Sequence, residues 1–464
     1  MMKTRVWMIV VASFFTVSFT ALAIAAGPKP QAAKPAPAAC TAFKTLLPAM
    51  QLKDGDTLVF LGDSITHQCL YTQYIEDFYY TRFPKLRIHF HNAGVGGDRA
   101  ADALARFDGD VAAYKPKYVT LLLGMNDGSY RDFDKTIFDT YQKDMTTLLG
   151  RVAAIGATAI PMTPTMHDAR AARMRGRPQE PRDTYYNGVL ALYGAWLREV
   201  AQVRGLGFVD MYAPLNQQTL DGRKKDACFT LMKDGVHPDA PGQVVMATAI
   251  LGDICPPSSV SGIVIQDKKG KLAANAFGGK VADFQDEGDR VAFTFTAAAL
   301  PWVLPAEAVP GYVLTHAGHH HSNESIAARG LKPGKYQLKI DGQPVGVYPD
   351  TQLAFRVELE ANEKTPQYQQ ALHVALLNKD RNDKAMHPLR DLWLKVKIGR
   401  RQLEQAAAKN DPQLAAKKQV FEKWLCGEFQ QNVAKLQTQL REYEDQIYQA
   451  NQPVARKYEL IRVK

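Results

Sequence analysis

Cysteine is scarce in this chain. Five cysteines occur among 464 residues, and no two of them form a C-x-x-C pair, so their spacing matches no zinc-binding pattern. Because the number is odd, an oxidising compartment would allow at most two disulfide bridges and would leave one free thiol. The five residues are Cys40, Cys69, Cys228, Cys255 and Cys426.

The chain also lacks the extreme composition of disordered, collagen-like or polytopic membrane proteins. Hydrophobic residues make up 46% and charged residues 22% of the sequence, which is ordinary for a globular protein. A chain of this length typically folds into about three structural units. The net charge of +10 comes from 57 basic and 47 acidic residues, an excess too small to indicate nucleic-acid binding by itself.

Residues 1–26 have the pattern of a secretory signal peptide. Lys3 and Arg5 precede an almost unbroken apolar run that ends in A-x-A triplets, which is the order of charged head, apolar middle and cleavage site. The alternative is an uncleaved membrane anchor, since a run of this length can just cross the roughly 30 Å hydrocarbon core. Polar residues within the run and the A-x-A triplets favour cleavage near residues 23–26. We therefore expect an exported protein, periplasmic or extracellular, with residues 27–50 as a Pro/Ala-rich linker.

Residues 51–255 alternate short apolar runs with helical patterns. The runs lie at 57–61, 86–90, 118–123, 157–162 and 207–210, and the helical patterns at 71–82, 99–113, 136–154, 184–204 and 242–251. This alternation predicts an α/β domain in which helices cover both faces of a parallel sheet. The loops at the carboxyl ends of the strands then gather along one edge, where a functional site is expected.

Two regions of different character follow. Residues 256–365 contain runs rich in Val, Ile, Tyr and Phe, which predict a small β-rich module, and Ile340-Asp341-Gly342-Gln343 has the pattern of a hairpin turn. The runs lie at 258–265, 280–284, 290–297, 334–341 and 353–360. Residues 366–464 are predicted to be helical to the end of the chain, with a break at 410–412 that produces an antiparallel helical hairpin.

The helical region is basic, and the β-rich module contains a histidine tract. Residues 376–464 hold 18 Lys or Arg and 11 Asp or Glu, which is most of the net charge. A solvated helix face is the first interpretation, and contact with an anionic cell surface or polysaccharide is the second. The four histidines at 316 and 319–321 offer a transition-metal site, but no carboxylate or cysteine accompanies them at ligand spacing. We therefore expect a solvated loop there.

A serine stands where the first predicted strand ends. Gly62-Asp63-Ser64 follows the run 57–61, and Gly62 permits a sharp turn. The nucleophile elbow of α/β-hydrolases requires glycine two positions after the serine, and Thr66 stands there instead. Taken alone, such a serine is more often a helix cap than a nucleophile.

Two further segments follow neighbouring predicted strands and fall at the same edge of the sheet. Residues 92–98 read Asn-Ala-Gly-Val-Gly-Gly-Asp, and residues 123–127 read Leu-Gly-Met-Asn-Asp. The glycines are not a dinucleotide fingerprint, because Arg99 stands where the last glycine would be needed. They can bring backbone N–H groups close to a reacting oxygen, and Asn126 can add a side-chain donor. An Asn-Asp pair after a strand is otherwise commonly just a turn.

A loop near residue 235 places a carboxylate three residues before an imidazole. Asp234-Gly-Val-His237-Pro precedes the helical pattern that begins at residue 242. On a short loop Asp234 can contact one ring nitrogen of His237 while the other nitrogen faces a serine. His167, which follows the run 157–162, is the rival base, but no Asp-x-x-His pattern accompanies it.

With these four blocks the sequence resembles the SGNH (GDSL-type) hydrolases. Gly62-Asp63-Ser64, Gly97 in the glycine segment, Asn126, and Asp234 with His237 stand in the order of that family. The resemblance covers about residues 54–255, less than half of the chain. It implies a three-layer α/β/α, flavodoxin-like parallel sheet.

The resemblance also implies roles for individual residues. Ser64 would be the nucleophile, His237 the general base and then acid, and Asp234 its orienting partner. The N–H groups of Ser64 and Gly97 and the Asn126 side chain would form the oxyanion hole, and Gly94 and Gly96 are the alternatives to Gly97. No metal or organic cofactor is required. Because His237 must be neutral to act as a base, activity should rise through roughly pH 6 to 8.

The predicted function is that of an exported serine esterase. Its substrates would be short-chain acyl or acetyl esters, on carbohydrate given the predicted export and the β-rich module. A lipid esterase or lysophospholipase would use the same residues, and a non-catalytic cell-surface binding protein on a hydrolase scaffold is the alternative of a different class. A nucleic-acid partner is not expected.

Overall fold

Four parallel strands form the sheet of the N-terminal region, in the order β2-β1-β3-β4. The strands are β1 (Thr57–Gly62), β2 (His89–Gly94), β3 (Tyr118–Leu122) and β4 (Thr158–Pro161). The computed structural model describes residues 42–174, 182–255 and 259–463, so the predicted signal peptide and most of the linker lie outside the described residues. The described residues from Phe43 onward form one compact unit.

Helices cover both faces of this sheet, which confirms the predicted α/β architecture. Alternate side chains of β1 enter two separate cores: Leu58 and Phe60 belong to one, and Val59 and Leu61 to the other. The first core includes side chains of α2 (Leu70–Arg82) and α8 (Ala240–Ile254). The second includes side chains of α3 (Ala100–Asp110), α4 (Lys135–Ala154) and α6 (Arg182–Arg204).

The fifth predicted strand, at 207–210, is wrong. Only Val209 pairs with the sheet, through an isolated parallel bridge to Met162. The next residue, Asp210, accepts hydrogen bonds from the N–H groups of Tyr212 and Ala213 at 3.0 Å each. This Asx turn starts α7 (Tyr212–Lys225), a helix that the sequence pattern did not predict, so the extended run ends after Val209.

The β-rich module consists of two sheets around a common core. One has the order β11-β10-β13-β8-β7 and the other β12-β9-β5-β6. The core draws Phe293 and Leu338 from the first sheet and Ile263 and Ile326 from the second. The strands are β5 (Ser261–Lys268), β6 (Lys271–Phe277), β7 (Gly279–Asp286), β8 (Arg290–Ala297), β9 (Glu324–Ala328), β10 (Lys335–Ile340), β11 (Gln343–Pro349), β12 (Val357–Glu358) and β13 (Arg456–Val463).

The predicted turn of this module is confirmed. Ile340 pairs with Gln343 in an antiparallel register, and Asp341 and Gly342 between them have φ of 50° and 80°. Two positive φ values in a two-residue loop are those of a type I′ hairpin turn.

The predicted strand at 353–360 is wrong, since one helical turn, α11 (Asp350–Phe355), precedes the short β12. Leu353 is the buried residue of that helix.

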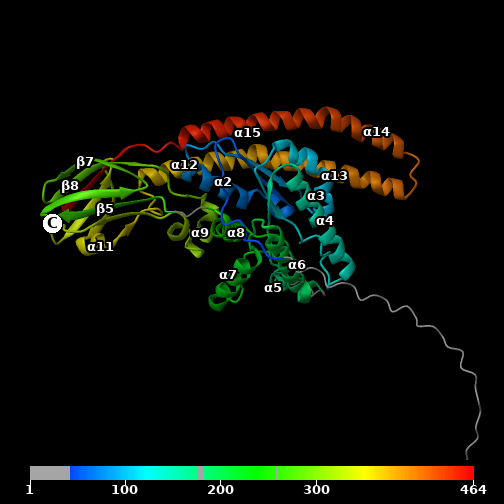
Figure 1. The fold of residues 1–464 in the computed structure, drawn as a ribbon, viewed down its shortest axis with the longest axis horizontal. Coiled ribbons are helices and arrows are strands. Elements are labelled where there is room, and N and C mark those ends of the chain that lie inside the picture. The colour runs from blue at the N-terminus through cyan, green and yellow to red at the C-terminus, as the bar shows by residue number, and fades with distance from the viewer. Residues whose placement is uncertain (1–41, 175–181, 256–258, 464) are drawn as a thin grey trace, which may run out of the picture. The chain divides into compact units, whose positions relative to one another are not determined.

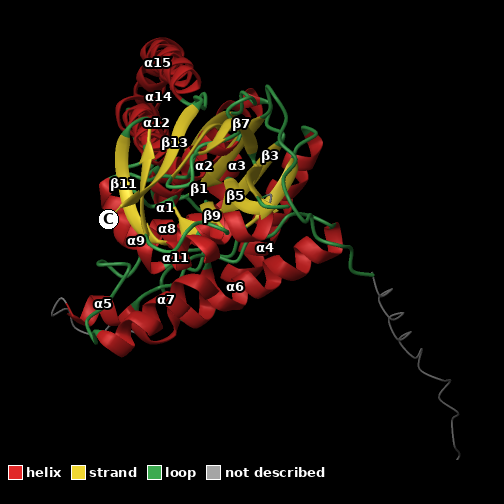
Figure 2. Cartoon of the chain, turned by 90° about the vertical axis from the view of Figure 1, so that its left-hand side faces the viewer, coloured by secondary structure: helices red, strands yellow, loops and turns green. Residues whose placement is uncertain are grey.

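The last residues of the chain were predicted to be helical, and this is also wrong. Residues 456–463 form β13, which pairs with β8 on one side and β10 on the other. Figure 2 shows β13 within this sheet, between β11 and β7. Tyr458 and Leu460 are buried and alternate with more exposed residues, which is the two-residue period of a strand. The β-rich module is therefore completed by the C-terminus, and the helical region is inserted before its last strand.

The helical region forms two antiparallel arms, which confirms the predicted hairpin (Figure 1). The first arm contains α12 (Pro366–Arg381) and α13 (His387–Ala408), and the second contains α14 (Leu414–Trp424) and α15 (Gln430–Ala450). The turn between the two arms contains Asn410, whose φ is 51°. Within α3, Gly109 leaves room for Trp393 of α13, because a Cβ on Gly109 would lie 2.9 Å from the Trp393 ring. Within the described residues, no helix is both long and apolar enough to span a membrane.

Candidate active site

The chain turns sharply between β1 and the one-turn helix α1 (Ser64–His67). The side chain of Thr66 folds back over Gly62, so that a Cβ on Gly62 would lie 2.0 Å from Thr66 Oγ1. The end of β2 is equally close, because a Cβ on Gly94 would lie 2.3 Å from the backbone nitrogen of His67. Glycine at both strand ends therefore lets α1 sit against the edge of the sheet, and this places Ser64 at the carboxyl ends of the strands.

Ser64, His237 and Asp234 form a continuous chain of hydrogen bonds. His237 Nε2 lies 2.7 Å from Ser64 Oγ, and His237 Nδ1 lies 2.6 Å from Asp234 Oδ2. A carboxylate only accepts hydrogen bonds, so Nδ1 carries the ring proton of a neutral His237 and Nε2 is left to accept from the Ser64 hydroxyl. The structure thus brings together all three residues that the sequence predicted as a triad.

The loop that carries Asp234 is held by the same carboxylate. Asp234 Oδ1 accepts hydrogen bonds from the N–H groups of Val236 at 2.9 Å and of His237 at 2.7 Å. Partial burial would raise the pKa of Asp234, but the hydrogen bonds from His237 and Val236 outweigh it and lower the pKa below its usual value. Asp234 is therefore ionised across the neutral range and orients the imidazole.

The glycine segment after β2 leaves one N–H group directed away from other partners. Gly94 N–H donates to Asn92 Oδ1 at 2.8 Å, and Gly96 N–H donates to His67 Nδ1 at 3.2 Å. Gly97 is exposed, with φ of 68°, and among the described residues no acceptor is found for its N–H group. Of the three glycines considered from the sequence, Gly97 is thus the one whose N–H group is open to a substrate.

Asn126 is held beside this segment by contacts on both ends of its amide. Its Nδ2 lies 3.1 Å from the carbonyl oxygen of Asp98 and 3.3 Å from Asp63 Oδ2. Its Oδ1 accepts a hydrogen bond from the Tyr130 hydroxyl at 3.2 Å. Sequence reasoning missed Tyr130, because no motif marks it. Its left-handed φ of 52° is seen only in the structure.

Two buried carboxylates lie beside the site. Burial raises the pKa of Asp63 to about 7; the hydrogen bond from Ile65 N–H opposes this shift, and repulsion by Asp127 adds to it. Burial likewise raises the pKa of Asp127 to about 7, against a hydrogen bond from Ala100 N–H. An acid whose pKa is raised on folding stabilises the fold fully below its unfolded pKa, and this contribution is lost as the pH rises through the folded pKa.

Replacing Asp63 by asparagine should therefore change how stability depends on pH. Asparagine can still cap α1 but does not ionise. The parent loses stability as Asp63 ionises, at about 1.4 kcal/mol per pKa unit, and the variant does not. The free energy of unfolding of Asp63→Asn minus that of the parent should therefore increase by at least about 1 kcal/mol from pH 5 to pH 8. Urea unfolding at each pH measures it. Asp132→Asn, at an exposed position, is the control and should show a constant difference. A constant difference for Asp63→Asn as well would contradict the raised pKa.

Among the described residues, one cluster has the donor atoms for a metal ion: His67, His387 and Asp391. His67 Nδ1 accepts from Gly96 N–H, so the ring proton of neutral His67 resides on Nε2, which lies 3.3 Å from Asp391 Oδ1. Burial lowers the pKa of His67 to about 4, with a further contribution from His387, so the neutral form prevails near pH 7. A protonated Nε2 is a donor to Asp391, and the cluster fits a hydrogen bond better than a metal.

Other histidines noted in the sequence lie elsewhere. His167 is buried, packs beside the rings of Tyr130 and Tyr186, and has its Nε2 3.8 Å from where a Cβ on Gly235 would lie. It thus lies beneath the loop that carries His237. The tract at 316–321 belongs to the short helix α10 (Ala317–His321) rather than to a loop, and His319 Nδ1 lies 2.9 Å from Glu358 Oε1.

Comparison with known proteins finds relatives of the α/β region. Residues 60–245 match the GDSL-like lipase/acylhydrolase family. An acetylxylan esterase from Geobacillus stearothermophilus is 27% identical over 228 residues, which cover 44% of this chain and 96% of that protein. The solved structure of that type of esterase from the same organism has a TM-score of 0.36 at 26% identity, with 44% of this chain and 96% of that chain covered.

A longer match is to a solved structure described as a gut microbial diltiazem-metabolizing enzyme. It has a TM-score of 0.77 at 25% identity and covers 90% of this chain and 99% of that chain. The α/β region, the β-rich module and the helical arms therefore recur together in a second protein. This chain is a carboxylic ester hydrolase, and its α/β region belongs to the SGNH/GDSL esterase family.

Proposed function

We propose that this protein is an exported serine esterase that removes acetyl or other short acyl groups from carbohydrate. Ser64 is the nucleophile, His237 the general base and acid, and Asp234 the residue that orients His237. The observation that carries the proposal is the unbroken hydrogen-bond chain from Asp234 through His237 to Ser64. The pattern of residues 1–26 supports export.

The proposed reaction proceeds in two acyl-transfer steps. His237 Nε2 takes the hydroxyl proton as Ser64 Oγ attacks the ester carbonyl, and the resulting imidazolium is stabilised by ionised Asp234. The tetrahedral intermediate then collapses: the C–O bond to the alcohol breaks, and His237 returns the proton to the leaving oxygen. Water, deprotonated by His237, attacks the acyl-enzyme in the same way and releases the carboxylic acid together with free Ser64.

Negative charge on the carbonyl oxygen would be stabilised by three donors near Ser64. Gly97 N–H is open, and no acceptor among the described residues is found for Ser64 N–H at the first position of α1. The Asn126 amide is the third donor, and it would share its hydrogens with Asp98 O and Asp63. Each such donor typically lowers the barrier by about 3 to 4 kcal/mol.

The exposure of the site favours a substrate attached to a polymer. The side chains of His237 and Asp234 are 35% and 41% exposed. A site this open leaves room for a chain of sugar rings to pass over it, whereas a long acyl chain needs an enclosed apolar pocket to gain affinity. The similarity to an acetylxylan esterase supports the same substrate class.

A panel of esters tests the substrate assignment. We expect kcat/KM to be highest for p-nitrophenyl acetate and at least about tenfold lower for the octanoate, because the open site contributes little binding to added methylenes. Acetate should also be released from acetylated xylan. Assays with Ser64→Ala measure the background in each case. A preference for octanoate or palmitate over acetate would contradict the carbohydrate assignment and indicate a lipid esterase.

A further inference from the structure

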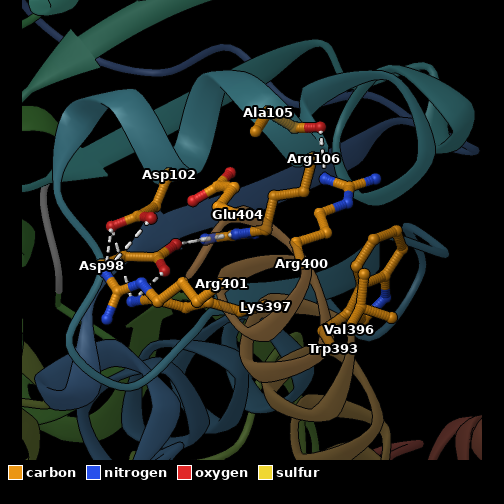
Figure 3. Close-up of a pocket in the computed structure, with 10 residues that line it drawn as sticks. All are labelled: Asp98, Asp102, Ala105, Arg106, Trp393, Val396, Lys397, Arg400, Arg401 and Glu404. Atoms are coloured by element: carbon orange, nitrogen blue, oxygen red, sulfur yellow. Dashed lines mark hydrogen bonds and ion pairs between the residues drawn. The ribbon is translucent and has the colours of Figure 1, made fainter. Parts of the chain in front are cut away.

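The helical region contacts the glycine segment of the active site directly. Lys397, on α13, lies about 300 residues from that segment in sequence, and its Nζ donates a hydrogen bond to the Gly96 carbonyl oxygen at 2.9 Å. The same ammonium lies 2.8 Å from Asp98 Oδ1. The Lys397 side chain is 8% exposed, so both contacts are shielded from water. Figure 3 shows Lys397 reaching from α13 toward Asp98.

The contact with Gly96 bears on the direction of the Gly97 N–H group. The Gly96 carbonyl and the Gly97 N–H belong to one planar trans peptide unit, in which they point in opposite directions. Fixing the carbonyl toward Lys397 therefore fixes the N–H away from it. Glycines on both sides would otherwise let this peptide rotate with little steric resistance. An ammonium on the carbonyl also polarises the unit and strengthens its N–H as a donor.

A second contact from α13 reaches the same residue. Asp391 Oδ1 lies 3.3 Å from His67 Nε2, and His67 Nδ1 accepts from Gly96 N–H. Both backbone polar groups of Gly96 are therefore engaged by residues connected to α13. Gly96, whose carbonyl shares a peptide unit with the open N–H of Gly97, is thus held by one direct and one indirect contact from the helical region.

A buried charge network anchors Lys397 itself. Asp98 Oδ2 accepts from Arg106 Nε at 2.8 Å, and Arg106 Nη2 also donates to the carbonyl oxygens of Ala93 at 2.7 Å and Gly62 at 3.2 Å. These carbonyls lie at the ends of β2 and β1, next to Ser64. Burial raises the pKa of Asp98, while Arg106 and Lys397 both oppose that rise. Lys397 thus belongs to a compact network that joins α13 to the strand ends beneath the site.

We propose that Lys397 is a positioning residue for ester hydrolysis, which holds the Gly96–Gly97 peptide so that Gly97 N–H faces the reacting carbonyl oxygen. The inference rests on the proposed function and extends it: the C-terminal helical region completes the oxyanion hole. Lys397 acts through Gly97 and does not touch the substrate.

Lys397→Met tests this role. Loss of an oxyanion donor typically lowers kcat by about 10² to 10³. A Gly96–Gly97 peptide that still samples the correct orientation keeps part of the stabilisation that this donor provides. We therefore expect kcat for p-nitrophenyl acetate to fall by about 10- to 100-fold, with KM changed less than about threefold. The control is Arg401→Met, since Arg401 pairs with Asp102 across the same α3–α13 interface at 3.0 Å but does not contact the glycine segment. Lys395→Met, on the exposed side of α13, is the second control. Both should retain kcat within about twofold.

Thermal unfolding of all variants separates a loss of stability from a loss of positioning. If Lys397→Met does not fold, Lys397→Arg replaces it, because a planar guanidinium keeps the charge near Asp98 but not the ammonium geometry at Gly96 O; its kcat should fall below that of Arg401→Lys. If the parent is active and the folded Lys397 variant has the same kcat as its Arg401 counterpart, Lys397 has no positioning role, while the proposed function still stands. A parent no faster than Ser64→Ala would overturn the proposed function and this role together.

Discussion

Ser64→Ala and His237→Ala are each expected to lower kcat for p-nitrophenyl acetate by about 10⁶-fold. The effect is large because Ser64 Oγ and His237 Nε2, 2.7 Å apart, act as one unit: without the hydroxyl no acyl-enzyme forms, and without the imidazole the hydroxyl keeps its proton. The residual rate should reflect the oxyanion hole and substrate binding alone. Steady-state hydrolysis by purified variants, with circular dichroism to confirm folding, measures it.

His167→Ala is the matched control for the histidine. His167 is the other imidazole near the loop, and it packs beside Tyr130 and Tyr186 rather than in the chain from Asp234 to Ser64. We expect its loss to lower kcat by less than about tenfold. If His167→Ala were as inactive as His237→Ala, or if His237→Ala kept its activity, the assignment of His237 as the base would be wrong.

Asp234→Asn is expected to lower kcat by about 10⁴-fold. Asparagine has the size of aspartate, but its amide can donate to His237 Nδ1 and so favours the tautomer whose Nε2 is protonated. That nitrogen then cannot accept the Ser64 proton, and the imidazolium also loses the negative charge that stabilises it. The pH dependence of kcat/KM, measured beside the absolute rate, separates the two effects.

Asp239→Asn is the control for this substitution. Asp239 lies two residues after His237 and caps α8 through a hydrogen bond from Gly242 N–H, a role that asparagine fills equally well. Its kcat should match the parent. A kcat for Asp234→Asn within about tenfold of the parent would show that His237 does not depend on the Asp234 carboxylate for its orientation.

Much of the site was predictable because its residues stand at strand ends and in one short loop. In a parallel sheet, the segments after β1, β2 and β3 must meet at one edge, so Ser64, Gly97 and Asn126 could be placed together before their geometry was known. The Asp-x-x-His spacing likewise predicts the contact between Asp234 and His237. The sequence did not distinguish Gly97 from Gly94 and Gly96, because that choice depends on which N–H groups neighbouring side chains already engage.

Contacts between distant segments were not predictable in the same way. The basic excess of the helical region suggested a solvated face or an anionic surface, but Arg390 is fully buried and pairs with Asp110 of α3 at 2.8 Å, and Lys397 pairs with Asp98. Charge composition does not say which partner a side chain has when the partner lies some 300 residues away. The strand β13 was missed for a related reason. Its eight residues follow a long helix and carry only a weak period-two pattern, and the strands that pair with them, β8 and β10, lie before that helix in the sequence.

Covalent labelling with a p-nitrophenyl phosphonate ester tests the central claim most directly. The phosphonyl group mimics the tetrahedral intermediate, so attack by an activated serine should release one p-nitrophenolate per chain and leave one phosphonyl group on Ser64, located by mass spectrometry of the peptide. Ser64→Ala should show no modification, and His237→Ala should be modified far more slowly than the parent. Modification at another residue, or equal rates in the parent and His237→Ala, would contradict the account of Ser64 as a nucleophile activated by His237.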